Sequence, residues 1–133
     1  MDKLEVLGLV GAENRSPAEI SGGMRKRAAV ARGLILEPEI LIYDEPTAGL
    51  DPIASRNVDD LINETAERFS GTSVVITHDM NTCFGVGHHV ALLHEGRIHA
   101  AGPPAAIAES ADPIVRRFLA ASGVTPVIKH DQG

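Results

Sequence analysis

The hydrophobic pattern in the middle of the chain predicts a strand, a helix and a second strand. The short apolar runs Ile40–Tyr43 and Ser73–Thr77 have the length of strands, and we expect both to be buried in a parallel sheet, the first on both faces. Between them lies an apolar stripe at helical spacing, formed by Val58, Leu61, Ile62, Thr65 and Phe69. This order of elements predicts an α/β domain whose parallel sheet is flanked by helices.

Capping residues mark where two helices begin. Ser21 precedes the run Gly22–Leu36, which is rich in Ala and Arg, and a serine there can accept hydrogen bonds from the first turn. Glu37-Pro38 ends this helix. Asp51-Pro52 places an N-cap aspartate and a proline at the start of the central helix, which Gly71 ends.

The C-terminal part of the chain alternates short elements with helix breakers. We expect a weak helix, a β-hairpin connected by Glu95-Gly96, two short helices and a frayed tail. The expected ranges are 81–86 for the weak helix, Val90–His94 and Arg97–Ala101 for the hairpin, Ala105–Glu109 and Ile114–Ala121 for the helices, and 122–133 for the tail.

Composition and charge exclude several functions. Twelve Lys and Arg against eighteen Asp and Glu give a net charge of −6, and aromatic residues are scarce. Nucleic-acid binding favours the opposite charge, so we expect no nucleic-acid partner. Cys83 is the only cysteine, which excludes an internal disulfide and favours a reducing compartment. No apolar run reaches the roughly 18–20 residues of a membrane helix, and residues 1–5 do not resemble a signal peptide.

Two carboxylates, Asp44 and Glu45, follow the first predicted strand. Open parallel sheets bind their ligands at this carboxyl edge. Adjacent side chains at a strand end point to different sides. One carboxylate can therefore hold a hydrated Mg²⁺ while the other orients or deprotonates a water. A solvated acidic turn is the alternative interpretation.

The start of the first predicted helix is a second candidate site. Ser21, Gly22 and Gly23 present backbone N–H groups without obstructing side chains, which suits an anion. The basic cluster Arg25–Arg27 follows in the first turns, where the helix dipole disfavours cations. A nearby anion or plain exposure to solvent would each make this cluster tolerable, and the sequence leaves both open.

Three motifs together resemble the ATP-binding cassette ATPase family. Residues 20–24 (ISGGM) resemble its signature motif, residues 40–51 (ILIYDEPTAGLD) its Walker B strand, catalytic glutamate and D-loop, and residues 76–79 (ITHD) its switch histidine. The resemblance implies a partial P-loop NTPase-like fold over residues 1–121. Residues 1–36 would end the helical subdomain with the signature helix, and residues 37–121 would hold the other motifs.

The resemblance implies that the intact cassette uses ATP and Mg²⁺. Glu45 would be the general base for the attacking water, and Asp44 would hold Mg²⁺ through water. His78 would contact the γ-phosphate, although a lone histidine at a strand end is more commonly a surface or core residue.

The resemblance also implies that two ATPase subunits work as a pair. The signature residues Ser21, Gly22, Gly23 and Met24 would contact the ATP held by the second subunit. Asp51 would couple the two subunits.

The family's phosphate-binding loop, G-x-x-x-x-G-K-[ST], does not occur in this sequence. Gly8–Ala12 lacks both the Lys-Ser/Thr end and a preceding strand. We therefore expect Met1 to fall inside a usual cassette and the chain alone to bind ATP weakly and hydrolyse none. Smaller departures are Met24, where Gln is commoner, and residues 87–89 (GHH) in place of Ala-Asp-Arg.

Local features resemble the cassettes that drive lipid transport with MCE-type partners. They are residues 21–24, 49–53, 78–80, 93–98 and 112–119. The resemblance implies a transmembrane permease as a partner and a cytoplasmic position on the inner face of the membrane. The alternatives are a non-transport cassette of DNA repair or translation, which the acidic charge disfavours, and a non-catalytic module that pairs with an intact cassette.

The remaining histidines and the cysteine carry no predicted chemistry. The hairpin region holds His88, His89, His94 and His99, but no clustered Cys or carboxylate accompanies them at ligand spacing, so we expect no metal there. Cys83 is expected to be a buried or half-buried thiol.

Overall fold

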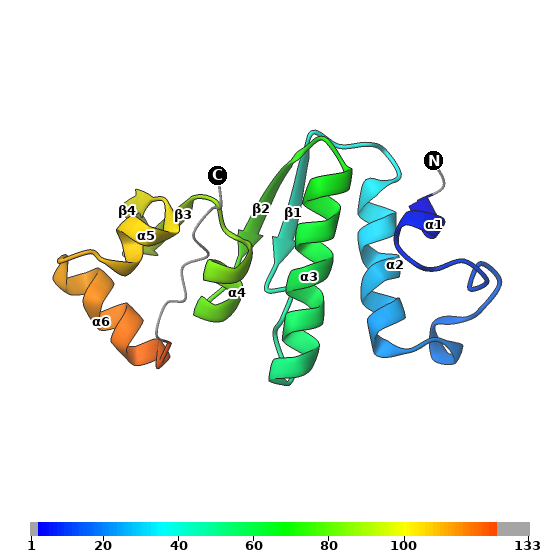
Figure 1. The fold of residues 1–133 in the computed structure, drawn as a ribbon, viewed down its shortest axis with the longest axis horizontal. Coiled ribbons are helices and arrows are strands. Elements are labelled where there is room, and N and C mark those ends of the chain that lie inside the picture. Colours follow the sequence, from blue (N-terminus) through cyan, green and yellow to red (C-terminus); the bar gives the residue numbers. More distant parts are fainter. Residues whose placement is uncertain (1–2, 125–133) are drawn as a thin grey trace. The chain divides into compact units, whose positions relative to one another are not determined.

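The computed structural model describes residues 3–124, and the chain divides into two compact units, Met1–Ile76 and Thr77–Gly133 (Figure 1). The first unit contains α1 (Lys3–Val6), the 3₁₀ turn η1 (Pro17–Glu19), α2 (Gly22–Leu34), β1 (Ile40–Asp44), α3 (Pro52–Arg68) and β2 (Thr72–Ile76). The second contains α4 (Met80–Val86), β3 (Val90–His94), β4 (Arg97–Gly102), α5 (Pro104–Ala108) and α6 (Pro113–Ser122). Residues 125–133, most of the predicted tail, lie outside the described part.

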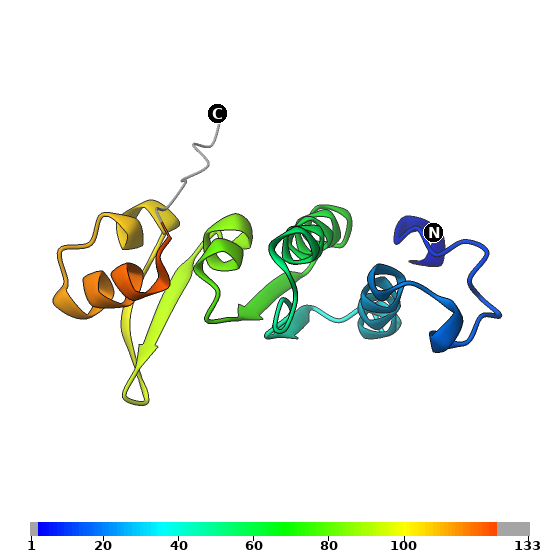
Figure 2. The same ribbon diagram turned by 90° about the horizontal axis from the view of Figure 1, so that it is seen from below.

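The predicted strand–helix–strand unit is confirmed. β1 and β2 pair in parallel, from Ile40 opposite Thr72 to Asp44 opposite Ile76, and α3 connects them. α2 and α3 run side by side and are both seen nearly end-on in Figure 2. No helix among residues 3–124 is long and apolar enough to cross a membrane.

The core of the first unit forms around the predicted stripe of α3. Val58, Leu61, Ile62 and Thr65 are all buried. Leu61 belongs to an apolar cluster with Leu7, Leu9, Ala31 and Leu34. α3 ends at Arg68, so Phe69 caps it and packs half-buried against this cluster; α2 ends at Leu34, two residues earlier than expected.

The expectation that β1 is buried on both faces is wrong, and β2 is also not fully buried by the described residues. Alternate side chains of a strand point to opposite faces, and those of one face are exposed: Ile40 by 59%, Ile42 by 62%, Val74 by 41% and Ile76 by 52%. We call these four residues the open sheet face. The opposite face is more protected, since Leu41 packs against the core cluster.

The second unit has its own small core under a hairpin. β3 and β4 pair antiparallel, and both Glu95 and Gly96 in their connection have positive φ, of 48° and 75°. The buried residues come from α4, β3, α5 and α6: Met80, Phe84, Val90, Ile107, Val115 and Leu119. The predicted hairpin and both short helices are therefore confirmed.

Candidate functional site

The carboxylates Asp44 and Glu45 lie at the carboxyl end of the parallel strand pair. Asp44 is the last residue of β1 and is exposed. The Glu45 N–H donates to the Ile76 carbonyl at 2.8 Å, which continues the strand pairing by one residue. Both acids therefore stand at the edge where parallel sheets bind ligands.

Glu45 adopts a backbone conformation that is unusual for its residue type. Its φ is +45°, in the left-handed region that costs a non-glycine residue on the order of 1–3 kcal/mol. In the turn that follows, the Ala48 N–H donates to the Glu45 carbonyl at 3.1 Å and the Leu50 N–H to the Thr47 carbonyl at 3.2 Å, and Thr47 is buried. The strained conformation turns the chain sharply at the residue that carries the second carboxylate.

Asp51 ends this turn by capping α3. Its Oδ1 accepts hydrogen bonds from the N–H groups of Ile53 and Ala54, both at 2.9 Å. The predicted N-cap is confirmed. The capping contacts fix the position of the Asp51 carboxylate seven residues after Asp44.

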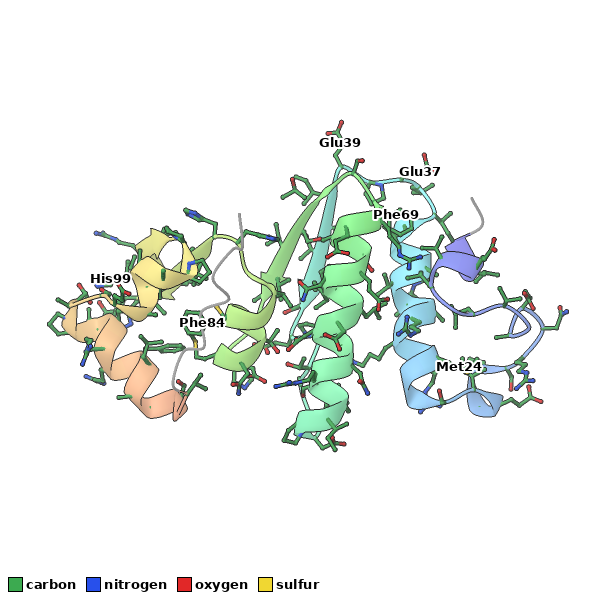
Figure 3. The ribbon with its side chains drawn as sticks, viewed as in Figure 1. Met24, Glu37, Glu39, Phe69, Phe84 and His99 are labelled. Atoms are coloured by element: carbon green, nitrogen blue, oxygen red, sulfur yellow. The ribbon has the colours of Figure 1, made fainter. Side chains whose placement is uncertain are left out.

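The start of α2 is open to an incoming group. The Ser21 side chain accepts from the Met24 N–H at 3.2 Å, as predicted for a cap. Gly22 and Gly23 are exposed, and a Cβ built on either would meet no atom closer than 3.7 Å. The packing of the chain therefore leaves room for side chains at both positions and does not itself require glycine there. The Met24 side chain packs partly against the core cluster near the beginning of α2 (Figure 3).

The basic cluster Arg25–Arg27 makes contacts that neither sequence interpretation anticipated. Arg25 Nη1 donates to the Ile20 carbonyl at 2.8 Å and Arg27 Nη1 to the Leu7 carbonyl at 3.4 Å. Lys26 Nζ donates to the Pro46 carbonyl at 3.2 Å. Arg27 also lies 3.7 Å from Glu64 of α3. The three cationic side chains therefore connect α2 to the residues that precede it, to the turn after β1 and to α3.

A groove of about 370 Å³ lies between α2, β1 and α3. Its lining includes Lys26, Tyr43, Asp44 and Pro46 together with apolar residues of α3. Burial raises the pKa of Tyr43, so this phenol stays neutral at physiological pH. The groove lies between the helix that carries the signature residues and the strand that ends in Asp44.

His78 follows β2 by two residues and belongs to the second unit. It is exposed. The residues on either side of His78 make hydrogen bonds to nearby residues. The Asp79 N–H donates to Thr77 Oγ1 at 3.0 Å, and the Asp79 side chain caps α4 by accepting from the Asn81 N–H at 2.9 Å. Asp44, Glu45 and the start of α2 thus all belong to the first compact unit, and His78 belongs to the second.

The second unit shows no further chemical centre among its described residues. No group of three or more potential metal ligands occurs within residues 3–124. His99 Nε2 lies 3.0 Å from Asp112 Oδ1, a pairing that the sequence did not suggest. Cys83 is half-buried, as expected, and burial together with the charge of Asp79 raises the pKa of its thiol, which disfavours the reactive thiolate.

The chain is similar to curated transport ATPases and to one family model. Residues 2–48 match the model of the ABC transporter family. A probable ribonucleotide transport ATP-binding protein, mkl, of Mycobacterium leprae is 38% identical over 96% of this chain and 37% of its own length. The intermembrane phospholipid transport system ATP-binding protein MlaF of Escherichia coli is 41% identical over 90% and 44%. The chloroplastic TRIGALACTOSYLDIACYLGLYCEROL 3 of Arabidopsis thaliana is 43% identical over 93% and 41%.

Solved structures of similar proteins are ATP-binding cassettes. A nucleotide-free cassette from an ABC transporter is matched with a TM-score of 0.72 and 25% identity, over 87% of this chain and 46% of that one. A dimeric, post-hydrolysis cassette bound to ADP and Pi gives 0.57 and 30%, over 76% and 44%. The chain spans about two fifths of the length of the curated relatives that it matches.

Proposed function

The chain belongs to the ATP-binding cassette transporter family, as part of its ATPase domain, and from this membership we propose that it supplies the signature helix and the catalytic acids of an ATP-hydrolysing subunit that drives membrane transport. The observation that carries the proposal is the pair Asp44 and Glu45 at the carboxyl edge of β1 and β2, with Glu45 held in a strained turn.

Glu45 is the proposed general base. Its carboxylate accepts the proton of the attacking water, a role that contributes ~10²–10⁴-fold to a rate. Asp44 suits Mg²⁺ because carboxylate oxygen is the ligand type that this ion prefers, and its exposed position leaves room for intervening waters. Bound Mg²⁺ would neutralise charge on the phosphates of ATP.

The start of α2 is the proposed contact with the ATP of a second ATPase subunit. Ser21, Gly22 and Gly23 form an exposed helix start, and the two glycines carry no Cβ atom, which favours the approach of a phosphate. In this proposal Met24 orients the helix start, Asp51 contacts the second subunit, and His78 contacts the γ-phosphate.

Phospholipid or another lipid is the proposed cargo. The names of two relatives support it, since MlaF serves intermembrane phospholipid transport and TRIGALACTOSYLDIACYLGLYCEROL 3 is named for a glycolipid. The proposed partners are a transmembrane permease, which would hold the ATPase on the inner face of the membrane, and an MCE-type lipid-binding protein. Addition of phospholipid vesicles should raise ATP hydrolysis by the assembly isolated through a tag on this chain. Stimulation by ribonucleotides instead would favour the function in the name of mkl.

Substitution of Glu45 tests the catalytic proposal. We expect Glu45→Gln in the tagged assembly to lower kcat for phosphate release at least ~100-fold, because the base is lost, while ATP still binds. The matched control is Glu39→Gln, the same change directly before β1. The Glu39 side chain projects away from the sheet (Figure 3), and its carbonyl accepts from the Thr72 N–H at 2.8 Å. Hydrolysis that survives Glu45→Gln unchanged would refute the assignment.

A further inference from the structure

The Lys26 side chain connects α2 to the turn that follows Glu45. Its ammonium group lies 3.2 Å from the Pro46 carbonyl and is partly buried. The two residues are twenty positions apart in the sequence. A charged donor makes a stronger hydrogen bond than a neutral one, so this contact can hold two segments at a fixed spacing.

The turn requires stabilising contacts because it contains a strained residue. Glu45 keeps its φ of +45° only if the surrounding contacts outweigh the cost. Inside the turn, the carbonyls of Glu45 and Thr47 accept from the N–H groups of Ala48 and Leu50 at 3.1 and 3.2 Å. The intervening carbonyl, that of Pro46, accepts from outside the turn, from Lys26.

From this geometry we propose that Lys26 is a positioning residue that sets the Glu45 carboxylate against the signature helix. The inference rests on the proposed function. Lys26 stands five residues after Ser21, roughly 7.5 Å along the helix axis at about 1.5 Å per residue. A shift of α2 at its first turn is therefore passed to the main chain next to Glu45 through the hydrogen bond from Lys26 to Pro46. Lys26 touches neither reacting atoms nor phosphate in this role.

The kinetic test separates positioning from phosphate binding. In the tagged assembly, Lys26→Met keeps the length of the side chain and removes its donor. We expect kcat for ATP hydrolysis to fall about 10- to 100-fold, the scale of a misplaced catalytic group, with KM for ATP changed less than about threefold. Lys26→Arg, which retains a donor, should recover most of the rate. Arg32→Met, which removes an exposed cation from the last turn of the same helix, is the control and should match the wild type.

Hydrogen exchange tests the same contact without measuring ATP hydrolysis. Hydrogen exchange of peptides that cover residues 44–51 should be roughly 3- to 10-fold faster in Lys26→Met, the change expected when one hydrogen bond is lost. Exchange in α3 at residues 56–65 should stay unchanged, which excludes general unfolding.

Two results would overturn the inference. One is a raised KM with unchanged kcat, which would make Lys26 a nucleotide-binding residue. The other is wild-type exchange over residues 44–51. Absence of ATP hydrolysis in the wild-type assembly would instead refute the proposed function, and the exchange experiment would still decide whether Lys26 holds the turn.

Discussion

At the scale of single residues, the Asp112 carboxylate both caps α6 and contacts His99. Its Oδ1 accepts from the N–H groups of Val115 and Ile114, at 3.1 and 2.9 Å, and lies 3.0 Å from His99. The hydrogen bond from Val115, followed by the contact with His99, lowers the pKa of Asp112 below its ordinary 3.8. A lowered pKa means that the ionised form is the one the folded chain prefers.

This predicts a loss of protection in α6 at low pH. The stability that Asp112 contributes is present above about pH 4 and disappears as the pH falls through its lowered value. Amide exchange in residues 113–122 should therefore accelerate in acid relative to the Asp112→Asn variant, which keeps a capping oxygen without the charge. Equal acid sensitivity of wild type and variant would show that the charge of Asp112 is not the cause.

Single residues also show where the sequence is informative. The caps Ser21 and Asp51 were predicted because each bonds only to its own first turn. The targets of Lys26 and Arg27 were not, since Pro46 and Leu7 approach them only after the chain has folded. The positive φ of Glu45 was equally hidden, because no residue type in the motif demands it.

At the scale of elements, the hairpin contains a bulge that alternation alone could not predict. Leu92 pairs with Ala100 and Leu93 with Ile98, so His99 is an extra residue in β4. Bulges redirect a side chain, and here the redirected side chain is the one that reaches Asp112. The two-residue connection itself was predicted correctly.

That connection offers a test of hairpin stability. Positive φ at both Glu95 and Gly96 is the mark of a type I′ turn, in which asparagine is favoured at the first position. We expect Glu95→Asn to raise the free energy of unfolding by up to about 1 kcal/mol, since the left-handed conformation costs an ordinary residue ~1–2 kcal/mol. Glu95→Val should lower it. Thermal unfolding followed by circular dichroism would measure both, and a lower midpoint for Glu95→Asn would contradict the turn type.

The strands show why burial was misjudged. An apolar run such as Ile40–Tyr43 indicates that a strand is meant to be covered, but it does not say which residues provide the cover. Helix α3 protects one face through its predicted stripe. The other face, with Ile42 and Val74, stays largely exposed among the described residues.

At the scale of the whole molecule, the open sheet face should govern how the chain behaves alone in solution. Apolar side chains beside an unpaired strand edge favour association. The double variant Ile42→Thr, Val74→Thr should stay monomeric up to a higher protein concentration than the wild type in sedimentation experiments. Its free energy of unfolding should change little. Val58→Thr, the same type of change in the core, should instead destabilise the fold by ~1–3 kcal/mol. Unaltered association of the double variant would show that another surface is responsible.

The open sheet face also has a consequence for the life of the chain inside a cell. Exposed apolar strands are what chaperones retain and proteases degrade. A chain synthesised in excess of whatever shields Ile40, Ile42, Val74 and Ile76 would be removed, and a shielded one would persist. The abundance of the protein would then follow the supply of its cover rather than the strength of its own promoter.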